Sequence, residues 1–197
     1  MNLAKGTIVI AALNAVLIGA LAVSLAFVGV AFAAPAQSPP VSTPAQSSAW
    51  KTYSYAADGF SASFPSEPAL QKQSVPTDAG TFELRAYVAN DGDSALYIGV
   101  CDYGSTASNT DPDAILNGAR DGAVENVKGR LVSTKKITFG VYPGLNYEIE
   151  SDSLHFSGRM YLVGSVLYQV VAAAPAAKPY ASSSKFLDSF QLIPRPA

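Results

Sequence analysis

The chain has 197 residues, and its 13 lysines and arginines against 15 aspartates and glutamates give a formal net charge of −2. A net negative charge excludes the strongly basic footprint of a nucleic-acid-binding protein. One Cys and one His exclude an intramolecular disulfide and the clustered Cys and His ligands of a zinc site.

The N-terminal segment has the features of an export sequence. Lys5 precedes an uncharged stretch from Gly6 to Ala34, which contains the small-residue sequence Ala31-Phe32-Ala33. A charged start, an apolar region and an A-x-A site are typical of a secretory signal peptide. The stretch is also long enough to span a bilayer, which takes about 20 residues. We therefore expect residues 1–33 to be a cleaved signal peptide or a retained membrane anchor, and the rest of the chain to be translocated.

The next segment, residues 34–49, is rich in Pro, Ala, Ser, Gln and Thr and carries no charge. Such a composition buries too little apolar surface to offset the entropy of ordering, which predicts a flexible linker. The folded domain is expected over residues 50–197. Its size is common for a single domain and needs no disulfide or metal for stability.

Strand patterns dominate the first part of this domain. Large and small residues alternate over Phe60–Phe64, and Pro65 ends the predicted strand. Two further strands are expected over Phe82–Ala89 and Leu96–Asp102. Between them, Asn90-Asp91-Gly92 is a turn sequence that tolerates a positive φ, which predicts a hairpin.

The period then changes to that of a helix. An apolar residue recurs every four positions, and the resulting stripe comprises Ile115, Leu116, Ala119, Ala123, Val124 and Val127. We expect Asp111 to cap this helix, Pro112 to occupy its first turn and Gly129 to mark its end. The carboxylates of Asp111 and Asp113 would complement the helix dipole.

Four strands and a helix are expected to complete the domain. The predicted strands are Arg130–Thr138, Tyr142–Glu150, Leu154–Val163 and Val166–Ala174. Their short connections require antiparallel pairing, and the last two strands are apolar on both faces, which predicts cover on both sides. Pro179 is expected to open the second helix, which would end before Pro194 with its inner face formed by Phe186, Leu187 and Phe190.

A short loop at Asp152-Ser153 would fix which residues share a face in the middle strands. One face would be polar and carry Glu148, Glu150, His155, Ser157 and Arg159. The other would be apolar and carry Tyr147, Ile149, Phe156 and Met160. The order of strands, helix, strands and helix predicts an α+β fold in which helices flank an antiparallel sheet.

Three sequences resemble those of PsbP-like and related Mog-type bacterial domains, namely Asp58–Pro65, Arg159–Val170 and Phe186–Phe190. The likeness extends from about Trp50 to Ile193. It implies a layered sandwich, with an antiparallel sheet flanked by helices, and it implies no catalytic set. The best-known members of the family are, as a group, accessory proteins that bind larger complexes.

Few residues suggest catalytic chemistry. His155 could pair with Asp152 and a distant serine, but the chain lacks a G-x-S-x-G elbow. We expect it instead to lie on a strand near a hairpin tip and to contact Glu150. Cys101 could be a nucleophile or an intermolecular disulfide partner, but its apolar neighbours favour a small buried side chain.

The remaining motifs are better explained by structure. Asp91 and Asp93, with Asn90, could contact calcium, but they lack the further oxygen ligands and fit a hairpin turn. S-x-x-K matches start at Ser48, Ser133 and Ser182 without their companion motifs, and we assign them to chance. Cross-strand packing rather than a partner surface is expected for the strand tyrosines, which are Tyr87, Tyr97, Tyr142, Tyr147, Tyr161 and Tyr168.

The sequence therefore assigns no catalytic, cofactor-binding or metal-binding residue. It favours a non-catalytic extracytoplasmic accessory domain, periplasmic or secreted, that binds a protein partner at the cell envelope. Membrane association is expected only through residues 1–33, if they are retained. Two alternatives stay open, a carrier of small apolar ligands with a cavity between sheet and helix, and a hydrolase with an unrecognised site.

Overall fold

The computed structural model describes residues 50–77 and 80–195. The larger of its two sheets comprises β3 (Ala69–Thr77), β4 (Gly80–Asp91), β5 (Ser94–Asp102), β6 (Arg130–Phe139), β7 (Tyr142–Glu150), β8 (Leu154–Val163) and β9 (Val166–Pro175). The smaller sheet comprises β1 (Lys51–Tyr55), β2 (Phe60–Phe64) and β10 (Gln191–Leu192). The helical elements are η1 (Ala56–Asp58), α2 (Ser105–Ser108), α3 (Pro112–Asn126) and α4 (Ser183–Ser189).

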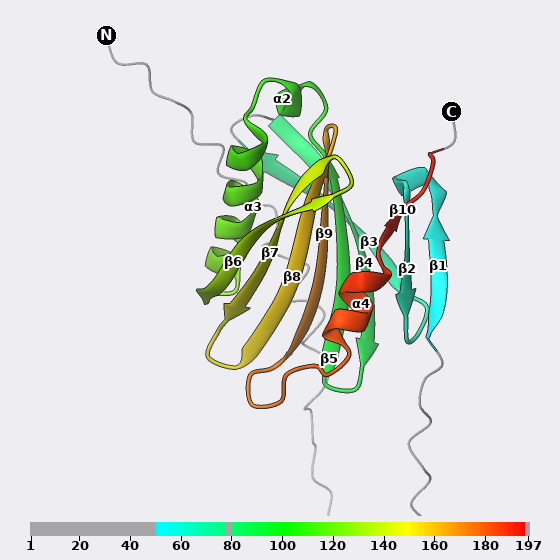
Figure 1. The fold of residues 1–197 in the computed structure, drawn as a ribbon, viewed down its shortest axis with the longest axis vertical. Helices are drawn as coiled ribbons and strands as arrows, with labels where there is room; N and C mark the ends of the chain where they lie inside the picture. The colour runs from blue at the N-terminus through cyan, green and yellow to red at the C-terminus, as the bar shows by residue number, and fades with distance from the viewer. Residues whose placement is uncertain (1–49, 78–79, 196–197) are drawn as a thin grey trace, which may run out of the picture.

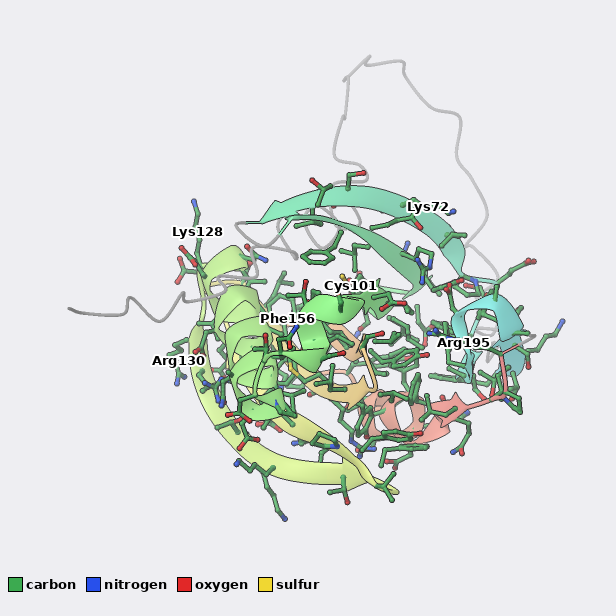
Figure 2. The ribbon with its side chains drawn as sticks, turned by 90° about the horizontal axis from the view of Figure 1, so that it is seen from above. Lys72, Cys101, Lys128, Arg130, Phe156 and Arg195 are labelled. Carbon is green, nitrogen blue, oxygen red and sulfur yellow. The ribbon has the colours of Figure 1, made fainter. Side chains whose placement is uncertain are left out.

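These elements form three layers. Neighbours in the larger sheet follow the order β3-β4-β5-β9-β8-β7-β6, and those in the smaller sheet follow β1-β2-β10. Helix α3 lies on one side of the large sheet, and α4 lies with the small sheet on the other (Figure 1). Seen from above, α3 lies between the β3–β4 and β6–β7 ends of the sheet, which curves around it (Figure 2). The α+β prediction is confirmed, and a second, smaller sheet joins the helices in covering the large one.

The face towards α3 is an apolar core. Tyr147, Ile149, Phe156 and Met160 are buried in it together, as the predicted register requires. The pairing of Glu150 with His155 fixes that register, and the Ser151 N–H donates to the Leu154 carbonyl across the turn at 2.8 Å. The predicted division of β7 and β8 into a polar and an apolar face is therefore confirmed.

The opposite face of the sheet is covered by an aromatic cluster. Phe190 lies at its centre and is 2% exposed. Its ring stacks on Tyr161 at 5.8 Å and on Phe60 at 5.9 Å between centroids. Phe186 and Leu187 of α4 are buried in the same cluster. β9 is buried on both faces up to Ala174, because the two cores lie on either side of it.

Several predicted elements match the structure closely. The bounds of β2, β7 and β8 are those expected from the alternation of their side chains. The Asp111 side chain caps α3 by accepting a hydrogen bond from the Asp113 N–H at 3.2 Å. The predicted hairpin between β4 and β5 is present, but its two turn residues are Gly92, at φ 59°, and Asp93, since Asn90 and Asp91 still pair with β5.

Two expectations about helix ends were wrong. Pro179 does not open the last helix, since α4 spans Ser183–Ser189 and Phe190 follows it in extended conformation. Residues before α4 instead form a loop in which Tyr180 hydrogen-bonds the β4–β5 hairpin. At the end of α3, the residue with positive φ is Lys128, at 48°, rather than Gly129. Gly129 is needed for a different reason, because a Cβ there would lie 2.6 Å from the Glu150 carbonyl oxygen.

Candidate functional site

A buried carboxylate joins the small sheet to the large one. Asp58 is 4% exposed and lies at the end of η1, separated from β2 by Gly59. Its Oδ1 accepts a hydrogen bond from the Arg85 Nε on β4 at 2.6 Å, and its Oδ2 accepts one from the Tyr87 hydroxyl. Both oxygens therefore have partners, as a buried charge requires.

The backbone beside this carboxylate contacts the C-terminal segment. The Asp58 carbonyl accepts a hydrogen bond from the Tyr168 hydroxyl at 2.6 Å. Arg195 Nη2 lies 3.0 Å from that hydroxyl oxygen and 3.4 Å from the same carbonyl. Gly59, at φ 73°, allows this approach, since a Cβ there would lie 2.8 Å from Arg195 Nε. The Asp58-Gly59 sequence thus fixes the position of an arginine 136 residues further on in the chain.

An open cleft of about 440 Å³ adjoins this cluster. Its lining combines apolar side chains, two tyrosines and one arginine, and comprises Gly59, Tyr142, Val163, Tyr168, Leu192, Ile193, Pro194 and Arg195. The volume falls within the range of small-ligand pockets, roughly 300–1,000 Å³. The polar side chains that line the cleft are those of Tyr142, Tyr168 and Arg195.

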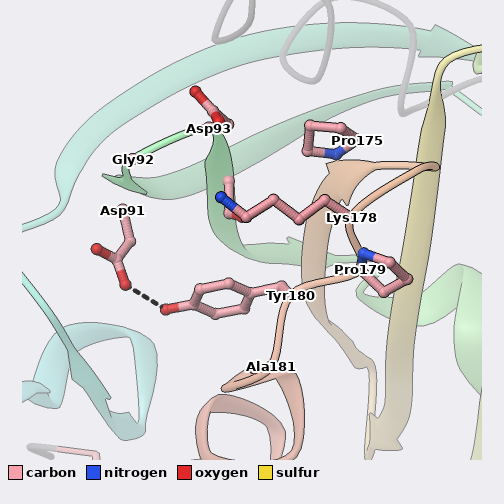
Figure 3. A pocket seen from close by; sticks show the side chains of 9 residues that line it. Asp91, Gly92, Asp93, Pro175, Lys178, Pro179, Tyr180 and Ala181 are labelled. Carbon is pink, nitrogen blue, oxygen red and sulfur yellow. Dashed lines mark hydrogen bonds between the residues drawn. The ribbon is translucent and has the colours of Figure 1, made fainter.

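A second cavity, of about 270 Å³, lies beside the β4–β5 hairpin. The Tyr180 hydroxyl donates a hydrogen bond to Asp91 Oδ2 at 2.6 Å across it. Burial, followed by this hydrogen bond, raises the pKa of Tyr180. Figure 3 shows Lys178 extending from the same loop towards the turn that carries Asp93. These contacts hold the loop before α4 on the hairpin, which gives Asp91 a structural role.

His155 lies on the polar face of β8, as predicted, and contacts Glu150. Its Nδ1 is 3.8 Å from Glu150 Oε1, and its Nε2 is 3.3 Å from the Ser157 hydroxyl oxygen. Arg130 forms a further ion pair with Glu150. The residue order resembles a triad, but Ser157 lies within a strand paired on both sides. Its neighbouring backbone N–H groups serve the sheet, whereas acyl transfer needs such donors aimed at an oxyanion.

Cys101 is buried in the core beneath α3, as expected for a small apolar side chain. Burial raises the pKa of its thiol to about 11, which keeps it protonated at neutral pH. The strand tyrosines are also mostly buried, which supports the packing interpretation. Among the described residues, no group of three or more His, Cys, Asp or Glu side chains is placed to hold a metal ion.

The S-x-x-K matches are scattered. Ser133 and its Lys136 lie on the exposed edge strand β6, where Lys136 Nζ binds Asp113 Oδ2 at 2.5 Å. Ser182 lies just before α4, and Ser48 lies outside the described residues. The described segments contain no helix long and apolar enough to cross a membrane, and the predicted export segment and linker lie outside those segments.

The chain matches no protein-family model and no curated protein. Among solved structures, it is similar to the solution structure of cyanobacterial PsbP (CyanoP) from Synechocystis sp. PCC 6803, with a TM-score of 0.53. The match covers 78% of this chain and 98% of that chain. The fold is PsbP-like. At 9% sequence identity the likeness concerns the fold alone and transfers no residue role.

Sequence reasoning missed the main features of the cleft in this PsbP-like fold. Arg195 belongs to no motif, and it meets Tyr168, which lies in the resembling segment Arg159–Val170, because β10 pairs with β2 and so positions the residues that follow β10. One indication was present, since Asp58-Gly59 opens the segment that resembles PsbP-like domains. An aspartate followed by a glycine at a strand start is, however, far more often a turn than part of a site.

Proposed function

We propose that the protein is a non-catalytic accessory domain that binds a protein partner at the cell envelope, outside the cytoplasm. The observation that carries this proposal is the PsbP-like fold, which matches the neighbour over nearly its whole length. The resemblance to PsbP-like domains implies an accessory role rather than a catalytic set. The position of Ser157 within a paired strand gives the hydrolase alternative little support.

The predicted N-terminal organisation fits this role. A linker of the length of residues 34–49 has a root-mean-square reach of about 20–24 Å. If residues 1–33 are retained, that reach keeps the domain close to membrane assemblies and raises its effective concentration there. A weak protein contact would then be sufficient for a stable association.

Exposed apolar side chains favour the outer edge of β6 as the contact surface. Leu131, Val132 and the hairpin residue Val141 are 37%, 42% and 88% exposed. Lys135 and Lys136 on the same strand disfavour the addition of another strand, because lysines on an edge oppose pairing. A partner would therefore contact side chains along β6 rather than extend the sheet.

In vivo photo-crosslinking tests the proposal. A photoreactive residue is introduced at Val132 or Val141 in the full-length protein, with Leu70 on the opposite edge strand, 49% exposed, as the matched control. We expect both β6-hairpin positions to capture one envelope protein that Leu70 does not capture. No specific adduct from either position, or the same adducts from all three, would contradict a partner surface along β6. Full-length protein in the cytosolic fraction would contradict the envelope location.

A further inference from the structure

We propose that the cleft beside the C-terminal segment binds a small carboxylic acid with an aliphatic or aromatic body, and that Arg195 receives the carboxylate. This site adjoins the proposed partner contact at the β6–β7 hairpin, where Tyr142 lines the cleft and its neighbour Val141 belongs to the contact surface. The other walls of the cleft come from Gly59, from β9 and the β8–β9 hairpin, and from β10 and the segment that follows it. The site differs in place from the cavity between sheet and helix that a carrier function suggested.

The first argument is that the guanidinium is held in position. Both contacts of Arg195, with the Tyr168 hydroxyl and the Asp58 carbonyl, use Nη2. The Nε edge lies against Gly59. Neither of these hydrogen bonds within the described residues uses Nη1, and we assign its two N–H groups to the ligand. Because an arginine oriented in advance loses less side-chain entropy on binding, such anchoring favours recognition of a planar carboxylate.

The second argument concerns charge. Among the described residues, no carboxylate lies within ion-pair distance of Arg195, although eight such pairs form elsewhere. The nearest buried acid, Asp58, is bound through its carboxylate by Arg85 and Tyr87. Asp102 accepts hydrogen bonds from the Ser165 hydroxyl and the Gly104 N–H. Within residues 50–77 and 80–195, no contacting carboxylate therefore neutralises the charge of Arg195 at the cleft.

The third argument is the chemistry of the walls. Val163, Leu192, Ile193 and Pro194 offer apolar surface, and Tyr142 adds an aromatic ring. A ligand that fits such walls has a hydrocarbon or aromatic body, since burial of apolar surface supplies much of the affinity of small-molecule sites. One fixed positive charge selects a monoanion, and the planar fork of arginine favours a carboxylate.

Calorimetric titration of the full-length chain in lipid nanodiscs tests the site, with empty nanodiscs as the blank. The probes are 4-phenylbutyrate, its neutral amide, and an acetylated tripeptide that ends in phenylalanine with a free carboxylate. We expect saturable binding of 4-phenylbutyrate and at least about tenfold weaker binding of the amide. Absence of saturable binding of 4-phenylbutyrate up to about 10 mM would overturn the proposal. Tighter binding of the peptide than of 4-phenylbutyrate would assign the site to a protein C-terminus and would also overturn it.

Arginine variants locate the site. Arg195→Gln is expected to weaken 4-phenylbutyrate binding about tenfold or more, and Arg195→Lys to give an intermediate loss, because lysine keeps the charge without the fork. Arg130→Gln is the matched control, since Arg130 lies on the other side of the molecule from Arg195 (Figure 2). Its affinity should equal that of the wild type. Equal affinity for Arg195→Gln and the wild type, with both folded, would overturn the assignment.

Discussion

The carboxylate of Asp58 and the guanidinium of Arg85 form an ion pair, 2.6 Å from Oδ1 to Nε, between the two sheets. The Asp58 side chain is 6% exposed and that of Arg85 is 21% exposed. Arg85 also binds Glu83 at 3.1 Å, whose side chain is half exposed. The pair therefore bridges the buried interior and the surface, and it attaches the end of η1 to β4, which lies next to the edge strand β3.

Removal of one partner from this pair should cost a large share of the stability. Asp58→Ala leaves Arg85 and the Tyr87 hydroxyl without their acceptor, and loss of one partner of a buried pair costs about 3–5 kcal/mol. The urea midpoint measures the loss. Asp121→Ala is the control, because its pair with Arg120 is on the surface and should contribute less than about 1 kcal/mol. Equal midpoints for the two variants would show that the Asp58 pair is not a structural contact.

Alanine substitutions at two glycines with positive φ distinguish the cost of backbone strain from the cost of a steric clash. Gly59 and Gly92 have φ of 73° and 59°, but only at Gly59 would a Cβ meet other atoms within 4 Å. An alanine in the left-handed region costs about 1–2 kcal/mol. We expect Gly92→Ala to lose that amount, and Gly59→Ala to lose more because its Cβ displaces Arg195. Thermal unfolding of the two variants checks this order, and a larger loss at Gly92 would contradict it.

The fold could be predicted where the sequence pattern is strong. The alternation along β7 and β8 placed His155 opposite Glu150, and the structure has that contact. The strand β3 was missed because it is an edge strand whose side chains are mostly polar and exposed. β10 has two residues and owes its conformation to pairing with β2, which no local pattern indicates.

The cleft could not be predicted for a related reason. Its polar groups come from residues that are distant in the chain, since Tyr168 lies 110 positions from Asp58 and Arg195 lies 137 positions from it. Only the tertiary fold brings them together. The end of the last helix shows the same limit, because Phe190 was correctly expected in the core but through a helix that already ends at Ser189.

Stability should fall at alkaline pH. Burial raises the pKa of Tyr97 and Tyr147, and it raises that of Cys101 from the ordinary 9.0 to about 11. Because these folded-state pKa values are raised, the stabilisation is complete below the unfolded-state values and is lost as the pH rises above them. The free energy of unfolding should therefore fall from about pH 9–10, by roughly 1.4 kcal/mol per pH unit for each proton that is released only on unfolding. The melting temperature, measured as a function of pH, should decline over the same range.

Tyr97→Phe tests the origin of this decline. The Tyr97 hydroxyl is buried and has no hydrogen-bond partner within the described residues. Its removal should leave stability at neutral pH unchanged or higher, since an unpaired buried polar group is unfavourable. The variant should also lose less stability above pH 10 than the wild type. A tyrosine titration that is complete near pH 10 while the protein stays folded would contradict the burial of these groups.

The last prediction concerns Phe190, which joins the C-terminal segment to the core. It contacts Phe60, Tyr161, Tyr168 and Phe139 at centroid distances of 5.9, 5.8, 5.5 and 6.0 Å, so its loss would open a cavity among four rings. Phe190→Ala should cost about 3–5 kcal/mol, against roughly 5–15 kcal/mol for a whole domain. Val141→Ala, at a side chain 88% exposed, is the control, and its stability should lie within about 0.5 kcal/mol of that of the wild type.

Because β10 follows Phe190 directly, Phe190→Ala should also release Arg195 from Tyr168, and amide hydrogen exchange at residues 191–193 should accelerate. An unchanged urea midpoint would show that the C-terminal segment is not docked on the aromatic cluster.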